Sequence, residues 1–274
     1  MRRNGGGMTA DGWNWKSGDG SRGGLLYEPG NWGDLLKLLW LAAAIRWKAG
    51  DGTVDYFDPF AGDVAYPLAE KTKERFNRAG PAELDFVRAP FIEKGSWPSA
   101  AAAAGCLPVG RRRVFDADAE KLKRWSGEPG VETLAGESGW SVMAAREADP
   151  REIWLIDPYD FLADWRTSLP LVAGGSGKAS ILLYAYNRSA AAAEAFASHR
   201  AFRNALADAR RGLPGCFGRT AADAFLPRAH HEMYFLPCPS DAAREDFPAF
   251  SATLERLSGE LAAAQAGTAA FGAV

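Results

Sequence analysis

The chain has 274 residues, a length that suits one large domain or two small ones. Its hydrophobic fraction of 47% and charged fraction of 24% are those of an ordinary globular protein, which excludes wholesale disorder. With 32 basic and 34 acidic residues the net charge is −2, which is not the balance of a protein that binds nucleic acid over its whole surface. The three cysteines are far apart in sequence, which excludes a disulfide scaffold and argues against a structural zinc site.

No segment predicts a secretion signal or a membrane anchor. The basic Arg2 and Arg3 are followed by glycines, where a signal peptide needs an apolar segment. The most apolar helical stretch, from Leu35 to Ile45, contains Lys37 and is far shorter than the roughly 20 residues that a bilayer requires. Free thiols suit a reducing compartment. We therefore expect a cytoplasmic protein with no membrane partner and no metal.

Helices and strands are predicted to alternate along the chain. The first element is a buried helix over residues 33–48, which Asn31 or Asp34 begins and a glycine-rich turn ends. The last is a helix in which Phe250 and Leu254 start an apolar stripe that continues through Leu257 and Leu261. Between them we expect strands at 54–57, 113–115, 131–134, 153–156, 180–184 and 232–236, and helices at 118–125 and 190–206.

This alternation predicts an α/β fold with a doubly wound, mostly parallel sheet. The strands at 153–156 and 180–184 are nearly continuous apolar runs, as expected of parallel strands that are covered on both faces. Residues 69–110 interrupt the alternation and are expected to form an inserted helical cap over the strand ends. The domain is expected to span 25–274, after a flexible lead-in of residues 1–24 that is rich in glycine and has no period.

Acidic residues and glycines follow the predicted strands. Asp58 and Gly62 come after the first strand, and Asp116 comes after the second. Gly136 follows the third strand and Asp157 the fourth. Because an open α/β sheet binds its ligand beyond the carboxyl ends of its strands, we expect these residues at one site. Carboxylates there suit a ligand with ribose hydroxyls or an amine, and they do not suit a polyphosphate.

Each of these residues also has a purely structural interpretation. Asp116 and Asp118 are both placed to cap the helix at 118–125. Gly62 suits a tight turn, and the dipeptide Asp157-Pro158 is by itself a turn signal. Their joint placement at the strand ends favours the functional interpretation.

The glycine-rich stretch 174–178 does not have the spacing of a phosphate-binding loop. Its first glycine position falls on Val172, and Ala179 replaces the required Ser or Thr. We expect a plain loop there.

Four blocks of the sequence resemble those of the bacterial 23S ribosomal RNA adenine-N6 methyltransferases. Residues 27–37, which read YEPGNWGDLLK, are similar to the family's opening signature AGNHADVLKH. Residues 58–62 resemble its S-adenosylmethionine loop, DTHAGAG. Val114–Asp116 resemble its ribose-binding strand end, and Ile156–Tyr159 resemble its catalytic DPPY motif. The blocks agree in order and rough spacing from about residue 25 to residue 240.

The resemblance implies a class I (Rossmann-like) methyltransferase that uses S-adenosylmethionine to methylate an exocyclic amine. The cofactor-binding residues that it implies are Lys37, Asp58, Phe60, Gly62, Asp116 and Gly136. In the implied catalytic block, Asp157 and the carbonyl of Pro158 accept the hydrogens of the amine, while the ring of Tyr159 stacks on the flipped base.

The implied partner is ribosomal RNA. Arg111–Arg113 and Arg210–Arg211 are candidates for a local phosphate-binding face. Because runs of arginine are more often solvated surface and the overall charge is nearly neutral, a small amine substrate stays open. The sequence also leaves the oligomeric state open.

The sequence departs from the family pattern at several positions. The second glycine of the cofactor loop is Val64, which Asp63 precedes, and the Asp-Gly after the third strand is Ala135-Gly136. The catalytic block has one proline instead of two, so Tyr159 comes one place early and Phe161 is a candidate to replace it. These departures keep a second hypothesis open, a methyltransferase-like fold without methyl transfer that acts as a binding or scaffold protein.

Overall fold

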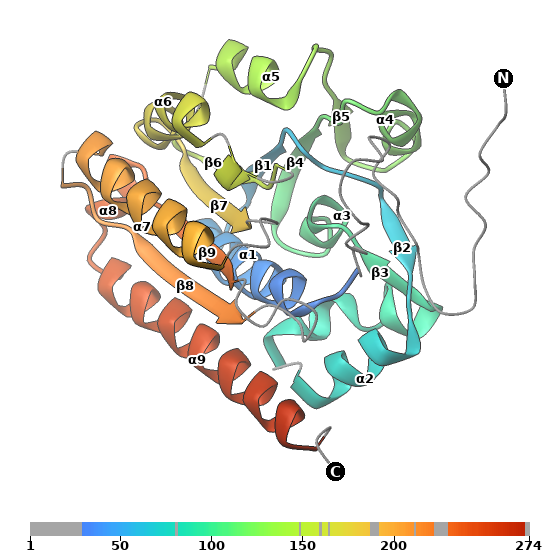
Figure 1. The fold of residues 1–274 in the computed structure, drawn as a ribbon. Coiled ribbons are helices and arrows are strands. Elements are labelled where there is room, and N and C mark those ends of the chain that lie inside the picture. The colour runs from blue at the N-terminus through green and yellow to red at the C-terminus, as the bar shows by residue number, and fades with distance from the viewer. Residues whose placement is uncertain are drawn as a thin grey trace, which may run out of the picture.

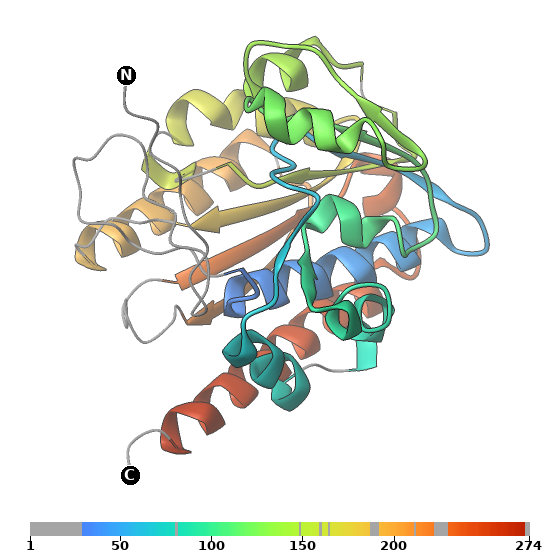
Figure 2. The same cartoon turned by 90° about the vertical axis from the view of Figure 1, so that its right-hand side faces the viewer.

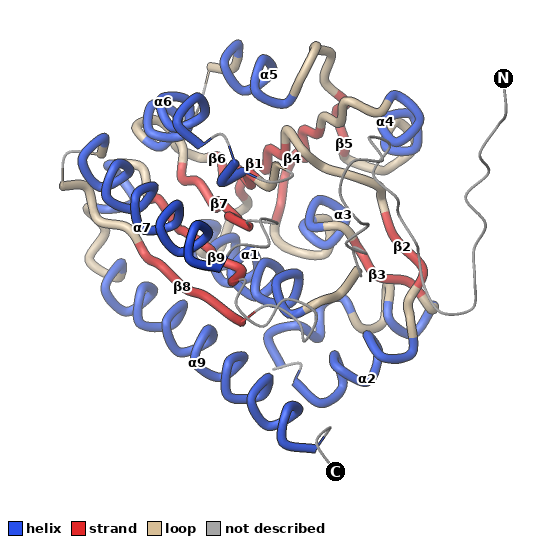
Figure 3. Tube along the Cα trace, viewed as in Figure 1, coloured by secondary structure: helices blue, strands red, loops and turns tan. Residues whose placement is uncertain are grey.

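The computed structural model describes residues 29–79, 82–147, 149–158, 161–163, 165–186, 192–210, 212–221 and 230–271. The predicted lead-in of residues 1–24 lies outside these ranges, and the domain range of 25–274 stays a prediction. The described part of the chain forms a central twisted sheet with helices packed on both faces (Figure 1, Figure 3).

The central sheet has seven described strands in the order β5-β4-β1-β6-β7-β9-β8. They are β1 (Val54–Asp58), β4 (Val109–Val114), β5 (Val131–Thr133), β6 (Glu152–Ile156), β7 (Ser180–Tyr186), β8 (Cys216–Ala221) and β9 (His230–Leu236). β9 is antiparallel to β7 and β8, and the other described pairs are parallel. This order, with one antiparallel strand next to the edge, is that of the class I, Rossmann-like methyltransferase fold. The predicted doubly wound, mostly parallel sheet is confirmed.

The helices are α1 (Trp32–Ala49), α2 (Glu70–Ala79), α3 (Ala100–Ala104), α4 (Ala119–Trp125), α5 (Gly139–Ala145), α6 (Trp165–Ser176), α7 (Ala192–Ala209), α8 (Pro239–Ala242) and α9 (Phe247–Phe271). Three short 3-10 turns lie at Ala82–Val87, Ile92–Lys94 and Phe161–Ala163. No helix among the described residues has the length and apolar character needed to cross a bilayer.

The sheet separates two apolar cores. Along β6, Ile153 and Leu155 point into the core beneath α1, α3 and α9, while Trp154 and Ile156 point into the core beneath α5, α6 and α7. Successive side chains of a strand point to opposite faces, so the centre of a strand that is buried on both sides is apolar, while buried Glu152 at the start of β6 is paired with Arg113 and Arg146. Figure 2 shows blue α1 and red α9 on one side of the strands and yellow α6 and orange α7 on the other.

The segment 69–110 lies beside α1 and α9. α2 contacts α9, the 3-10 turn at Ala82–Val87 contacts α1, and α3 packs between α1 and the strands β1 and β4. β3 (Ser96–Pro98) pairs with β2 (Ala65–Pro67) in a two-stranded antiparallel sheet. This segment therefore combines helices with a strand, and the run from β3 into α3 is the part of it that reaches the strand ends.

The expectation of a plain loop at 174–178 is wrong for residues 174–176, while residues 177 and 178 form a turn. α6 continues through Gly174 and Gly175 to Ser176. The reason is tertiary packing, because a Cβ on Gly175 would lie 2.9 Å from the ring of Trp154, so the glycine lets the helix lie close against the sheet. Local glycine content favours a loop, and helix-to-sheet packing overrides it.

Candidate active site at the ends of β1 and β6

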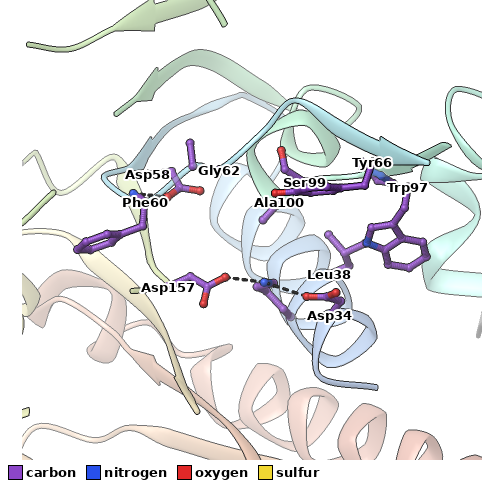
Figure 4. A pocket seen from close by; sticks show the side chains of 13 residues that line it. Asp34, Leu38, Asp58, Phe60, Gly62, Tyr66, Trp97, Ser99, Ala100 and Asp157 are labelled. Carbon is purple, nitrogen blue, oxygen red and sulfur yellow. Dashed lines mark hydrogen bonds and ion pairs between the residues drawn. The ribbon is translucent and has the colours of Figure 1, made fainter. Parts of the chain in front are cut away.

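A pocket of about 70 Å³ lies beyond the carboxyl ends of β1 and β6. The strand order reverses between these two strands, since the chain goes from β1 to β4 on one side and later returns to β6 on the other. A reversal of this kind opens a crevice at the strand ends. The described lining residues are Asp34, Lys37, Leu38, Asp58, Phe60, Ala61, Gly62, Tyr66, Trp97, Pro98, Ser99, Ala100 and Asp157 (Figure 4).

Lys37 is the cation among these lining residues. Its Nζ lies 2.5 Å from Oδ2 of Asp157 and 3.1 Å from Oδ1 of Asp34, and dashed lines mark both contacts in Figure 4. It also lies 4.8 Å from the centre of the Tyr184 ring. Burial lowers the pKa of Lys37, but the carboxylates of Asp157 and Asp34 outweigh burial and hold that pKa well above its usual value. Lys37 is therefore charged at any working pH.

The start of α1 explains how Lys37 reaches the pocket. Asn31 caps the helix, since its Oδ1 accepts hydrogen bonds from the amides of Gly33 and Asp34. The backbone of Gly30 has a φ of +78°, and its amide donates to Oδ2 of Asp34. Asp34 and Lys37 are three positions apart and so share one helix face. Asn31 is thus the cap that the sequence offered as one of two choices, and Asp34 becomes a wall of the pocket.

Asp58 ends β1 as a buried carboxyl, 2% exposed. Its Oδ2 accepts from the hydroxyl of Tyr56 at 2.9 Å, and its Oδ1 accepts from the amide of Phe60 at 2.9 Å. Burial raises the pKa of Asp58 to about 7, although the hydrogen bonds from Phe60 and Tyr56 act in the opposite direction. The carboxyl group of Asp58 therefore titrates near neutral pH.

Gly62 and Asp116 meet next to the pocket. The amide of Gly62 donates to Oδ2 of Asp116 at 2.9 Å, and the amide of Asp118 donates to Oδ1 of Asp116 at 2.8 Å. Gly62 has a φ of +67°, and a Cβ there would lie 2.7 Å from the hydroxyl of Tyr66. The cap of α4 is Asp118, whose side chain accepts from the amide of Glu120. Asp116 therefore binds the loop after β1 to the end of β4, and its carboxyl group is 14% exposed.

Phe60 and Gly136 lie toward α5. The ring of Phe60 packs edge-on against Trp140 with centroids 5.0 Å apart. Gly139, which begins α5, allows this approach, because a Cβ there would lie 2.4 Å from the Phe60 ring. A Cβ on Gly136 would lie 2.3 Å from Cγ2 of Val142, so close packing of α5 accounts for this glycine. Gly136 is not among the lining residues of the pocket.

The predicted catalytic block is described in part. Asp157 follows β6 and faces the pocket, and Pro158 is buried behind it. Tyr159 lies outside the described residues. Phe161 does not take its place: it is 4% exposed and packs against Phe202 with centroids 5.0 Å apart, in the core on the other face of the sheet. Phe161, which the sequence offered as the alternative to Tyr159, is not among the described lining residues of the pocket, because its ring packs in that core.

Of the arginines that the sequence offered as candidates for a phosphate-binding face, three of the four that the structure describes are held by protein groups. Arg112 and Arg210 are buried and donate to backbone carbonyl oxygens. Arg113 is paired with carboxylates of β1, β5 and β6. Arg111 is exposed, and Arg211 lies outside the described residues. Arg112 is buried because alternate residues of strand β4 point inward, whereas Arg210 is buried just after the end of α7, and both buried guanidinium groups need acceptors.

No pattern in the sequence predicted three of the residues that line the pocket. Tyr66 and Trp97 come from the paired strands β2 and β3, and Ser99 caps α3 beside them. Their strands are three residues long and show no alternation. Only the pairing of Tyr66 with Trp97, 31 positions later, places them together at the pocket.

No protein-family model matches the sequence, and no curated protein matches it. Among solved structures, the chain is similar to protein LPL1258 of Legionella pneumophila, which is described by the family model DUF519. The TM-score is 0.65 at 14% identity, over 85% of this chain and 94% of that one. A likeness at this level of identity shows a shared fold and nothing further.

Two methyltransferase structures match more distantly. TYW2 of M. jannaschii in complex with AdoMet has 8% identity and a TM-score of 0.41, over 74% of each chain. The plantazolicin methyltransferase BamL in complex with SAH has 7% identity and a TM-score of 0.41, over 74% of this chain and 85% of that one. These TM-scores fall below the level at which whole folds correspond.

Proposed function

We propose that the protein is an S-adenosylmethionine-dependent methyltransferase that acts on an exocyclic amine, with adenine N6 of ribosomal RNA as the acceptor that the sequence resemblance favours. The observation that carries this proposal is the carboxylate of Asp157. Lys37 holds it through Oδ2, at 2.5 Å. Its Oδ1 makes no hydrogen bond with any residue that the structure describes, and so it is available to accept a hydrogen from an amine.

The residues around the pocket fit the cofactor. Asp34, Asp58 and Asp157 surround one lysine, a balance that suits the positive charge of a sulfonium and an ammonium. Each oxygen of Asp116 accepts one backbone amide and keeps a second lone pair for a ribose hydroxyl. A volume of about 70 Å³ suits the reacting groups. Ligand pockets usually measure about 300–1,000 Å³, so the nucleoside is expected to lie along the strand ends toward Asp116.

The chain's own groups have defined tasks in this reaction. When bound, S-adenosylmethionine would supply an electrophilic methyl group and leave as S-adenosylhomocysteine, and the methylated nitrogen would release one proton to solvent. Asp157 accepts a hydrogen bond from the acceptor nitrogen, which raises the electron density of that nitrogen and stabilises the positive charge that develops on it. Lys37 keeps the other oxygen of Asp157 occupied, so the carboxylate keeps one orientation. Asp34 holds Lys37 from the far side.

Two measurements test the proposal. Calorimetric titration of the full chain with S-adenosylhomocysteine is expected to show binding. Methyl transfer to total bacterial RNA and to small amines is then compared for the wild type, Asp157→Ala and Asp157→Asn. Loss of a contact that strengthens as charge develops is expected to lower turnover of Asp157→Ala by about 10²-fold or more, with cofactor affinity nearly unchanged.

The asparagine variant is the matched control, because its amide oxygen still accepts a hydrogen bond, so its loss of turnover is expected to be smaller. Equal turnover of the wild type and Asp157→Ala would remove Asp157 from the mechanism. No binding of S-adenosylhomocysteine at millimolar concentration would contradict the proposal and favour a binding or scaffold protein. Methyl transfer to small amines and not to RNA would show that the acceptor is a small amine and not adenine N6 of ribosomal RNA.

A further inference from the structure

The loop of residues 60–64, which follows β1, is bound from outside by the end of α4. The guanidinium of Arg124 donates from Nε to Oδ1 of Asp63 and from Nη2 to Oδ2, both at 2.7 Å. The next residue of α4, Trp125, donates from Nε1 to the carbonyl of Gly62 at 3.0 Å. Two adjacent residues of the helix thus hold two adjacent residues of the loop.

The same loop is held from the inner side. The amide of Gly62 donates to Asp116, and the amide of Asp63 donates to the hydroxyl of Tyr66 at 3.2 Å. Oδ1 of Asp63 also accepts from the amide of Val64 at 3.0 Å. Asp63 is therefore the residue through which Arg124 acts on the backbone of the loop, and Phe60, Ala61 and Gly62 of that loop line the pocket.

The two α4 contacts differ in kind. Trp125 is fully buried and is fixed by the core around it. The side chain of Arg124 is 49% exposed, and two parallel N–H···O bonds fix its position. The hydrogen bonds of loop 60–64 are only partly buried, and such bonds open more easily than those of a core. A binding loop that is ordered in advance also costs less to bind its ligand. Of the two contacts, the Arg124–Asp63 ion pair is therefore the one that can open without disturbing the core.

We propose that Arg124 is a positioning residue, which orders loop 60–64 through Asp63 and so prepares the cofactor-binding surface that Gly62 and Asp116 form. Asp63 and Val64 stand at positions where the loop of the resembled family is rich in glycine. In this chain the ion pair of Arg124 with Asp63, the Arg124–Asp63 clamp, orders the loop instead. The effect on cofactor affinity rests on the proposed function. The ordering of the loop does not.

Hydrogen exchange of the unliganded full chain tests the ordering directly. The amides of Gly62 and Asp63 are followed in the wild type, Arg124→Gln, Asp63→Asn and the double variant. Exchange is expected to be roughly two- to fivefold faster in Arg124→Gln, the range of an exposed ion pair. The double variant is expected to exchange no faster than Asp63→Asn alone, because the two residues act as one contact. Lys123→Gln, which removes a neighbouring exposed charge of α4, is expected to leave exchange unchanged.

Affinity for S-adenosylhomocysteine tests the consequence. The dissociation constant of Arg124→Gln is expected to rise roughly two- to fivefold at low salt and to approach that of the wild type at about 0.5 M salt, where screening weakens the pair in the wild type too. Arg124→Lys, which keeps the charge, is expected to restore part of the affinity.

The outcomes separate the two proposals. If hydrogen exchange at Gly62 and Asp63 is unchanged in Arg124→Gln, the Arg124–Asp63 clamp does not order the loop, whether or not the cofactor binds. Faster exchange with equal affinity at low salt overturns its positioning role. Absence of binding by the wild type overturns the proposed function, while the exchange measurement still decides the clamp.

Discussion

Lys37 and Asp157 are 120 positions apart in the chain, and the Nζ of one lies 2.5 Å from Oδ2 of the other. The contact joins the first helix to the loop after the fourth parallel strand. Both partners are largely buried, with 10% of the lysine side chain and 24% of the aspartate side chain exposed. A buried charge is tolerated when it is paired, so each of these two residues depends on the other.

Substitution of Lys37 by Met is expected to lower the free energy of unfolding by about 2–4 kcal/mol, because the cation that Asp34 and Asp157 share is lost. A double-mutant cycle of Lys37→Met and Asp157→Asn is expected to give a coupling free energy of about 1–3 kcal/mol between the two residues. Urea unfolding of the four proteins measures it. Lys123→Met, an exposed lysine of α4, serves as the control, and a coupling near zero would contradict the pairing.

The stability of the protein is expected to depend on pH through Asp58. Its pKa is about 7 in the folded chain, above the ordinary value of 3.8, so the folded state binds a proton more tightly than the unfolded state. The stability that this proton contributes is present below about pH 4 and is lost as pH rises to 7, with a slope of up to about 1.4 kcal/mol per pH unit.

Urea unfolding of the wild type and Asp58→Asn at several values between pH 4 and pH 8 tests this dependence. The difference between the two proteins isolates Asp58, because the other titrating groups are common to both. The wild type is expected to lose stability relative to the variant as pH rises through that range. Parallel curves would show that Asp58 does not titrate there.

Asp116 is expected to serve both stability and cofactor binding. Asp116→Ala removes the acceptor of two backbone amides, so a loss of about 1–2 kcal/mol in the free energy of unfolding is expected. If it also holds the ribose hydroxyls, affinity for S-adenosylhomocysteine should fall about tenfold or more. Asp118→Ala is the matched control: loss of the α4 cap should cost about 1 kcal/mol and leave affinity unchanged. Equal affinities of the two variants would exclude a ribose role for Asp116.

Gly218 is expected to be intolerant of any side chain. A Cβ there would lie 2.4 Å from both Trp40 Cζ2 and Ser258 Oγ, where β8 crosses α1 and α9. Gly218→Ala is therefore expected to lower the midpoint of thermal unfolding, with a cost of about 1–3 kcal/mol from overpacking. Gly259 is the residue after Ser258, and a Cβ built on it has no other atom within 4 Å. Gly259→Ala should therefore stabilise the chain by about 0.5–1 kcal/mol. A smaller effect at Gly218 than at Gly259 would contradict this packing.

Local sequence was enough to predict the elements that follow local rules. α1 begins at Asn31, one of the two starts that the sequence offered, the apolar runs at 153–156 and 180–184 are strands, and the apolar stripe of α9 from Phe250 to Leu261 is buried. It was also enough to predict that Asp58 and Asp157 lie at one pocket, because parallel strands bring their carboxyl ends to one edge. These results depend on residues that are close in sequence or on a rule common to all parallel sheets.

The partners of those residues depended on the tertiary structure alone. Lys37 meets Asp157 only because α1 packs on the sheet against β1, β7, β8 and β9, and Trp97 reaches the pocket only through its pairing with Tyr66. Arg112 belongs to an apparently exposed basic run and yet is buried among backbone carbonyls. Each outcome depends on strand order and helix packing, which bring together residues that are distant in the chain, and local patterns of polarity carry no information about such distances.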